Sequence, residues 1–306
     1  MQSTLPTTGH GTLVAMVAIE ARRFARHPLF LLGALVALVL QPLVSGVGDP
    51  FASDVLAWPI IPAFFIGLPS LVVAALLTRS TEAASEAMGT APGSEARRTL
   101  AVAGAAVVPF TVGLLWLAEL FAIVSIKGVH PHELWFGTMD DLHVWGILLA
   151  LGPVACLGGA LLGVLAGRWL TFRGAPAVVV VALVAVDIGA QIGTMGEDIV
   201  AHHASGDLGV RARLLAPWAL WHSGGLPDGR ASVGGGDPVW YLFYLLALCA
   251  LAVGGAAWHD RTARTPRLRL TLYAVIGVAV TFLALAVFAG PEAGTVSEPV
   301  PFKVEG

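Results

Sequence analysis

The sequence predicts an all-α fold, a bundle of helices that crosses a membrane several times. Only 12% of its 306 residues are charged, whereas a soluble domain carries about 25%. Hydrophobic residues make up 57%, and the mean hydropathy is +0.81. A soluble domain of this length has no core large enough to hide so much apolar surface. The composition and the net charge of −3 also argue against a disordered protein and against a nucleic-acid-binding one.

Seven apolar segments are close to the length of about 20 residues that a helix needs to cross the hydrocarbon core. In chain order they are Leu29–Val47, Trp58–Leu77, Leu100–Ile126, Val144–Trp169, Ala175–Ile192, Trp240–Trp258 and Leu270–Phe288. We expect the second segment to bend, because it contains Pro59, Pro62 and Pro69.

Residues 1–28 precede the first span and are expected to form an amphipathic interfacial helix, or elbow helix, on the cytoplasmic side. The stretch Leu13–Phe30 mixes apolar residues with Glu20, Arg22, Arg23 and Arg26, which is typical of a helix that lies in the membrane surface. We do not expect a signal peptide, since neither a basic region nor a small-residue cleavage site precedes Glu20.

The basic residues predict the orientation, because Lys and Arg accumulate in cytoplasmic loops. With the N-terminus inside, twelve of the 17 Lys and Arg residues fall in inner segments. Tryptophans lie at span ends, where an amphipathic ring prefers the headgroup level, at Trp58, Trp145, Trp169, Trp240 and Trp258. Seven spans then put the tail after Phe288 outside.

The long outer loop, residues 193–239, is the least regular part of the chain. Leu214–Trp221 is apolar but too short to cross, so we expect an interfacial or re-entrant element there. The glycines and prolines from Gly224 to Pro238 predict a flexible loop.

Enzymatic motifs are missing from the sequence. It contains no G-x-x-x-x-G-K-[ST] phosphate-binding loop, no H-E-x-x-H zinc motif and no G-x-S-x-G nucleophile motif. We therefore predict no catalytic residues and no cofactor bound by this chain.

Histidines and carboxylates gather in two outer clusters that are weak candidates for a metal site. Such ligands suit zinc or copper, and the candidates are His130, His132, His143, Asp198, His202 and His203. No spacing matches a known metal site. We prefer the interpretation that these residues form a hydrated outer rim, and predict no metal.

Two carboxylates, Glu119 and Asp187, fall inside apolar segments. Because an ionisable group in a membrane is costly, both are candidates for a translocation path. The structural alternative is a hydrogen bond to a neighbouring helix or contact with outer water. Separately, Gly159, Gly163 and Gly167 recur every fourth residue, which favours close helix packing within the chain or across a dimer.

Three stretches, in this order, resemble the membrane subunit of a type 2 ABC exporter, of an actinobacterial kind. The first is the charged elbow helix from Glu20 to Phe30. The second is the loop Arg79–Leu100, which contains Glu82, Glu86, Pro92, Arg97 and Arg98. The third is Leu214–Trp221 with the polar loop that leads into the span starting near Trp240.

The resemblance implies a six-span permease domain over residues 29–258. Residues 259–306 add a basic inner loop, a seventh span at 270–288 and an outer tail, which the six-span family pattern lacks. Such a permease works as a dimer in the bacterial cytoplasmic membrane, with ATP and Mg²⁺ bound by a separate ATPase subunit. The implied substrate is an amphipathic or hydrophobic compound such as a drug, an antibiotic or a lipid.

The resemblance also assigns coupling to the ATPase to Glu82, Glu86, Pro92, Arg97 and Arg98. From the residues, Thr81 is expected to cap a helix that runs from Glu82 to Met88 and ends at Gly89. Glu82 and Glu86 then share one face that can meet basic residues of a partner.

Two rival functions remain at this point. One is a proton-coupled secondary transporter that uses Glu119 and Asp187. The other is a membrane immunity or sensor protein that transports nothing and binds a ligand on its outer histidine-rich surface.

Overall fold

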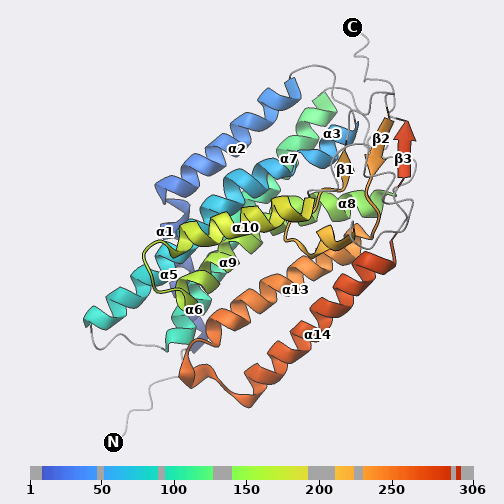
Figure 1. Ribbon diagram of the computed structural model, residues 1–306. Helices are drawn as coiled ribbons and strands as arrows, with labels where there is room; N and C mark the ends of the chain where they lie inside the picture. The colour runs from blue at the N-terminus through green and yellow to red at the C-terminus, as the bar shows by residue number, and fades with distance from the viewer. Residues whose placement is uncertain are drawn as a thin grey trace, which may run out of the picture.

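The computed structural model is a bundle of long helices with a small sheet at one end (Figure 1). It describes residues 9–46, 52–88, 94–126, 140–191, 211–223, 230–290 and 294–297. Six helices in these ranges are long and apolar enough to cross a membrane. The predicted helical, multi-pass membrane fold is therefore confirmed at this level.

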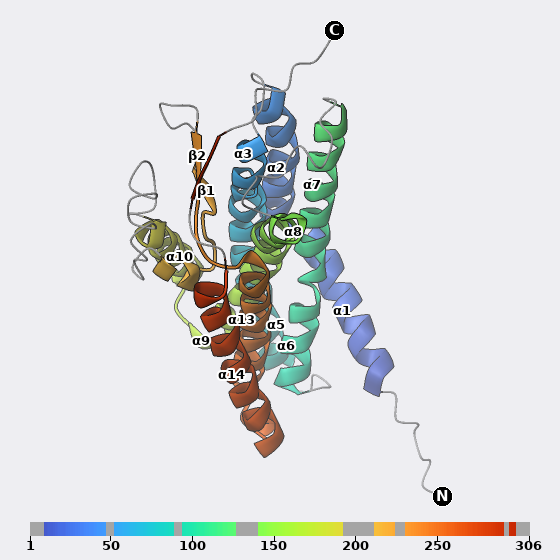
Figure 2. The same ribbon diagram turned by 90° about the vertical axis from the view of Figure 1, so that its right-hand side faces the viewer.

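The first half of the chain makes three crossings of the bundle. Helix α1 (Gly9–Ala25) leaves the bundle at an angle (Figure 2), and α2 (Pro28–Gly46) makes the first crossing. The second crossing is broken, as its prolines predict, into α3 (Ala52–Ala57), α4 (Ile60–Pro62), the π-helix η1 (Ala63–Gly67) and α5 (Leu68–Met88). The third consists of α6 (Glu95–Gly104) and α7 (Val107–Ile126).

The second half makes four more crossings. The fourth contains α8 (Asp141–Leu149), the π-helix η3 (Ala150–Val154) and α9 (Ala155–Trp169). Helix α10 (Ala175–Gln191) follows, and then the 3-10 helix η4 (Ala212–Leu215). The last two crossings are α13 (Pro238–Ala257) and α14 (Pro266–Phe288), joined through the 3-10 helix η5 (Arg261–Ala263).

A three-stranded antiparallel sheet departs from the all-α prediction. Its order is β1 (His222–Ser223), β2 (Arg230–Val233) and β3 (Gly294–Ser297). Strand β2 lies in the segment expected to be a flexible loop, and β3 follows α14, so that Val233 pairs with Gly294. This pairing needs partners far apart in sequence, which local composition does not reveal.

Among the described residues, α10 runs between the two ends of the bundle, as the six long helices do. We call the end with β1, β2 and β3 the sheet end, and the opposite end, where α5, α9 and α13 finish, the basic end. Since β3 pairs with β2, the segments after α10 and after α14 lie at the same end. Helix α10 must therefore carry the chain across, although its 17 residues span only about 25 Å. Of the seven predicted segments, six correspond to long apolar helices, and Ala175–Ile192 corresponds to the shorter α10.

Helix α9 is the central element of the bundle and packs against α5 and α13. Its three ridge glycines lie against the α5 side: a Cβ at Gly159 or Gly163 would overlap the carbonyl oxygen of Gly67 or Leu71. A Cβ at Gly167 would come within 2.9 Å of the Ala75 oxygen. The ridge thus allows two backbones to touch within one chain.

Candidate functional site

A cavity of about 530 Å³ lies between η1, α9, α10, α13 and the segment that contains Pro217 and Trp218. Nearly all of its lining side chains are apolar, and the polar ones are Asp187 and Gln191. Its volume falls in the range of about 300–1,000 Å³ that is usual for small-molecule sites. This is the best-formed candidate site in the described part of the chain.

Small residues and the π-helix η1 make room for the cavity. Ala63 and Gly67 of η1 and Gly158 of α9 line it and offer little side-chain volume. The π-helix follows Pro59 and Pro62, which have no backbone N–H to donate to the preceding turn. The Cys156 thiol of α9 donates to the Pro62 carbonyl at 3.4 Å, and so satisfies a backbone oxygen in this irregular turn.

Asp187 and Gln191 lie one helical turn apart at the end of α10 and join it to the outer loop. The Trp218 N–H donates to Asp187 Oδ1 at 3.4 Å. Gln191 Nε2 donates to the Trp218 carbonyl at 3.0 Å, and the Leu220 N–H donates to Gln191 Oε1 at 3.2 Å. These bonds fix the sheet end of α10 over the cavity.

The predicted re-entrant element, Leu214–Trp221, has no long helix but is largely buried. Arg213, only 1% exposed, donates to the Leu220 and Gly235 carbonyls at 3.0 and 2.9 Å and stacks over the Trp221 ring. Burial lowers the pKa of Arg213 to about 10, so it stays protonated at neutral pH.

Two tyrosines of α13 complete this element. The Tyr241 hydroxyl donates to the Ala216 carbonyl at 2.8 Å, and the Tyr244 hydroxyl donates to the Leu215 carbonyl at 3.2 Å. We call residues 211–221 the outer cap, because they cover the sheet end of the cavity.

The structure does not bring the two membrane carboxylates together. Glu119 lies on α7 and does not line the cavity, whereas Asp187 does. Glu119 Oε2 is buried with no hydrogen-bond partner among the described residues. In the described part of the chain, Asp187 is therefore the carboxylate that faces the cavity.

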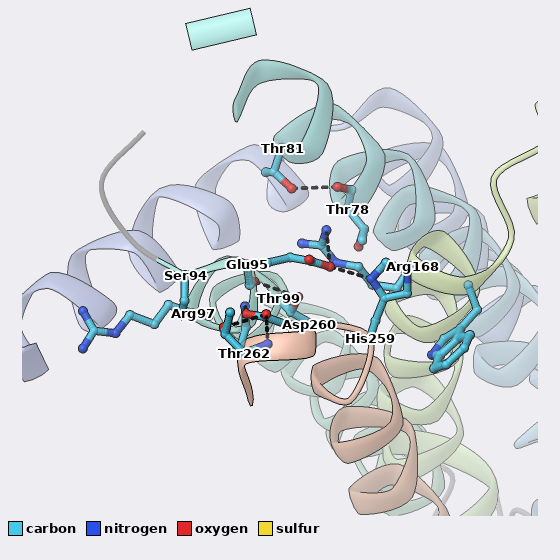
Figure 3. Close-up of polar contacts among 12 residues, drawn as sticks. Thr78, Thr81, Ser94, Glu95, Arg97, Thr99, Arg168, His259, Asp260 and Thr262 are labelled. Atoms are coloured by element: carbon cyan, nitrogen blue, oxygen red, sulfur yellow. Dashed lines mark hydrogen bonds and ion pairs between the residues drawn. The ribbon is translucent and has the colours of Figure 1, made fainter. Parts of the chain in front are cut away.

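A second polar site lies at the basic end, where three crossings meet (Figure 3). The Glu95 carboxylate is 2.6 Å from His259 Nδ1 and 3.6 Å from the buried Arg168 guanidinium. Asp260 accepts hydrogen bonds from the Ala96 N–H at 3.0 Å and from both the N–H and the hydroxyl of Thr262. We call Glu95, Arg168, His259 and Asp260 the basic-end network.

Asp260 has a lowered pKa, and the cause is local. Burial raises the pKa of this carboxyl group, but hydrogen bonds from Thr262, Ala96 and Ala263 outweigh burial and hold it below its ordinary range. Asp260 thus stays ionised at neutral pH and ties the α13–α14 turn to the start of α6.

Some of the residues predicted to couple to an ATPase lie beside this network. The structure does not describe the side chains of the others. Glu82 and Glu86 fall on α5, but only their backbone is described, and Pro92 lies outside the described residues. Arg97 is exposed and points away from the network, and Arg98 is partly buried (Figure 3 shows Arg97).

The expected Thr81 cap is wrong. Helix α5 runs without a break from Leu68 to Met88, and the Thr81 hydroxyl donates back to the Thr78 carbonyl at 2.7 Å. The next helix, α6, is the one that has a cap, because Ser94 Oγ accepts from the Arg97 N–H at 3.3 Å.

The elbow helix contacts the same end of the bundle. On α1, Arg23 pairs with Glu20 at 2.9 Å and donates to the Ser80 hydroxyl of α5 at 2.9 Å. Arg22 and Arg26 are both exposed. The charges that define this helix in the sequence therefore also fix it to the second crossing.

Most of the metal candidates lie outside the described residues, namely His130, His132, Asp198, His202 and His203. His143 lies near two carboxylates, at 3.2 Å from Asp140 and 3.7 Å from Asp237. Asp140 caps α8 by accepting from the His143 N–H. Within the described ranges, no group of three His, Cys, Asp or Glu residues is arranged to hold a metal ion.

Several functional candidates were not predicted from the sequence. Gln191 follows Asp187 by four residues, and this spacing alone places both on one helix face. Arg213, Glu95, Arg168, His259 and Asp260 carried no sequence signal beyond their charge, because the contacts that join them to other elements lie 7 to 164 residues away.

Comparison with known proteins adds no relative: no family model, no curated protein and no solved structure matches this chain. Its function is therefore argued from the cavity, the outer cap and the basic-end network.

Proposed function

We propose that this chain is the permease subunit of an ATP-driven exporter in the bacterial cytoplasmic membrane, with its N-terminus inside. The proposed complex contains a second permease copy or paralogue and a separate ATPase subunit that binds ATP and Mg²⁺. The substrate is an amphipathic or hydrophobic compound, and this chain itself is no enzyme.

The observation that carries this proposal is the apolar cavity between the crossings. A cavity of about 530 Å³ is large enough for a small molecule. One wall is α10, which packs on α5 and α9 and exposes apolar side chains at Val178, Val181 and Val186. Such a wall suits entry of an apolar substrate from the lipid.

The basic-end network supports the proposed coupling to an ATPase. It joins the start of α6, the end of α9 and the α13–α14 turn, so a push at this end is transmitted to three crossings together. Two of these elements, α9 and α13, line the cavity. A partner that binds at this end can therefore act on the cavity walls.

The test is the charge reversal of Glu82 and Glu86 to Lys in the chain co-expressed with an ABC ATPase from the same operon, which the proposal requires. We expect the ATPase to be lost from the purified complex and export to fall at least about tenfold, because both residues lie in the proposed docking segment. The matched control is Asp141→Lys, an exposed acid at the sheet end, with unchanged co-purification. A normal complex and normal export in the double variant would contradict the coupling assignment, and the lack of any ATPase partner would contradict ATP-driven export.

A proton-coupled carrier is the second candidate, and the position of Asp187 in the cavity favours it. Such a carrier needs Asp187 to exchange protons with both sides of the membrane. Transport by the purified chain in vesicles with a pH gradient and without ATP would support this rival, and transport that requires ATP would exclude it.

A further inference from the structure

The charges around the cavity restrict the ligands that it can hold. Among the described lining residues, Asp187 is the one acid, and none is Arg, Lys or His. Among the described residues no basic group pairs with Asp187, and its one hydrogen bond, from the Trp218 N–H, is long at 3.4 Å. An apolar chamber with an acid that no base neutralises attracts positive charge.

The neighbouring polar groups do not compensate Asp187. The Gln191 amide uses its nitrogen to donate to the Trp218 carbonyl and its oxygen to accept from the Leu220 N–H, both in the outer cap. Arg213, the nearest buried cation of the outer cap, points its donors at the Leu220 and Gly235 carbonyls and is not part of the lining. The cavity thus presents no positively charged donor to an anion.

Aromatic side chains add to this preference. Phe64 of η1 and Trp218 of the outer cap both line the cavity. The faces of such rings attract organic cations, most strongly where water is excluded. The remaining walls, built from residues such as Leu162, Leu183 and Leu248, favour an apolar body.

We propose that this cavity binds amphipathic monocations, molecules with a bulky apolar body and one positive charge that pairs with Asp187. This inference rests on the proposed function, since it names the class of compound that the exporter moves. Anions of the same shape are excluded, because they would meet Asp187 and no positive charge.

The test compares two probes of the same shape and opposite charge, tetraphenylphosphonium and tetraphenylborate. Binding to the purified full-length chain in detergent is measured at neutral pH, with empty detergent micelles subtracted. We expect the phosphonium ion to bind at least about tenfold more tightly than the borate, which corresponds to about 1.4 kcal/mol.

Three variants locate the binding. Asp187→Asn keeps an acceptor for the Trp218 N–H but removes the charge, so we expect phosphonium affinity to fall about tenfold or more. Glu119→Gln, a neutralised membrane acid outside the cavity, is the matched control and should bind as the wild type does. Gly158→Leu should weaken both probes, because a Cβ fits at Gly158, whose nearest neighbour is Cys249 Sγ at 3.7 Å, while a larger side chain fills the cavity.

A second measurement uses the wild-type chain and does not depend on the folding of a variant. A hydrophobic carbodiimide that modifies membrane carboxyl groups is applied with and without the phosphonium ion, and the products are mapped by mass spectrometry. We expect protection at Asp187 and none at Glu119.

Equal binding of the two probes, an Asp187→Asn variant with wild-type affinity, or unprotected Asp187 would each overturn the proposal. These outcomes are distinct from failure of the proposed function. Charge-selective binding in a chain that has no ATPase partner would support the cation site and contradict ATP-driven export. A normal ATPase complex that binds the two probes equally would contradict the cation site alone.

Discussion

The two sides of α9 use glycine in opposite ways. Toward α5, Gly163 and Gly167 let the two backbones touch, and no space for a side chain is left. Toward α10 and α13, Gly158 borders a cavity of about 530 Å³. Glycines of one helix therefore allow backbone contact on one side and leave space for a cavity on the other.

The difference lies in the partner of α9 and not in the glycines. Beside Gly163 and Gly167, α5 is a regular α-helix, and its backbone stays in contact with the backbone of α9. Gly158 faces α13 instead, where the nearest atom to an added Cβ is Cys249 Sγ at 3.7 Å, and α10 is held at its far end by Asp187 and Gln191, which bond to the outer cap. A small residue gives close packing only where the neighbouring backbone can approach.

The largest effect is expected on the closed side, from Gly163→Leu. Its Cβ would overlap the Leu71 carbonyl, and backbone atoms cannot give way as a flexible side chain can. We expect a loss of about 3 kcal/mol or more in the free energy of unfolding, seen as loss of the monodisperse peak in size-exclusion chromatography. Gly158→Ala, on the open side, is the control and should behave as the wild type does; equal damage from both changes would contradict the comparison.

An intermediate effect is expected at the attachment of α10, from Gln191→Leu. The change leaves the Trp218 carbonyl and the Leu220 N–H without their partner, at a cost of about 2 kcal/mol. We expect a lower melting temperature and loss of phosphonium binding, because the outer cap no longer holds α10 over the cavity. Gly189→Ala on the same helix adds a methyl group in open space and should be harmless. An unchanged melting temperature in Gln191→Leu would show that the cap does not hold α10.

The smallest effect is expected at the basic end, where Asp260→Asn disturbs neither side of α9. We expect a loss of about 1 kcal/mol in stability at pH 7, because the amide cannot reproduce all the hydrogen bonds of the carboxylate. Since the pKa of Asp260 is lowered in the folded state, its stabilisation is full above the ordinary carboxyl range and disappears as the pH falls through the lowered value.

Melting curves of wild type and Asp260→Asn should therefore begin to converge as the pH falls below about 4. Arg261→Gln, a change at the exposed neighbouring residue, is the control and should show no such dependence. A gap between the Asp260 variant and the wild type that stays constant from pH 7 to about pH 3 would contradict the assigned role of the carboxylate.

The apolar runs of the sequence determined the membrane-spanning helices by themselves. Six of the seven predicted segments correspond to long apolar helices, with ends that agree within a few residues, as for Leu270–Phe288 and α14. This succeeds because length and hydropathy are local properties, and a bilayer imposes the same requirement on every crossing. The three prolines of the second segment likewise predicted an irregular crossing.

Only the tertiary structure decided which groups meet. The sequence ranked Glu119 with Asp187, but the fold puts Asp187 alone at the cavity and places Gln191, rather than a second acid, beside it. The Glu95–His259 contact joins residues 164 positions apart, and the sheet joins β2 to a strand beyond α14. Periodicity and composition carry no information about such distant partners. These contacts depend on how the helices pack side by side and on where α10 ends.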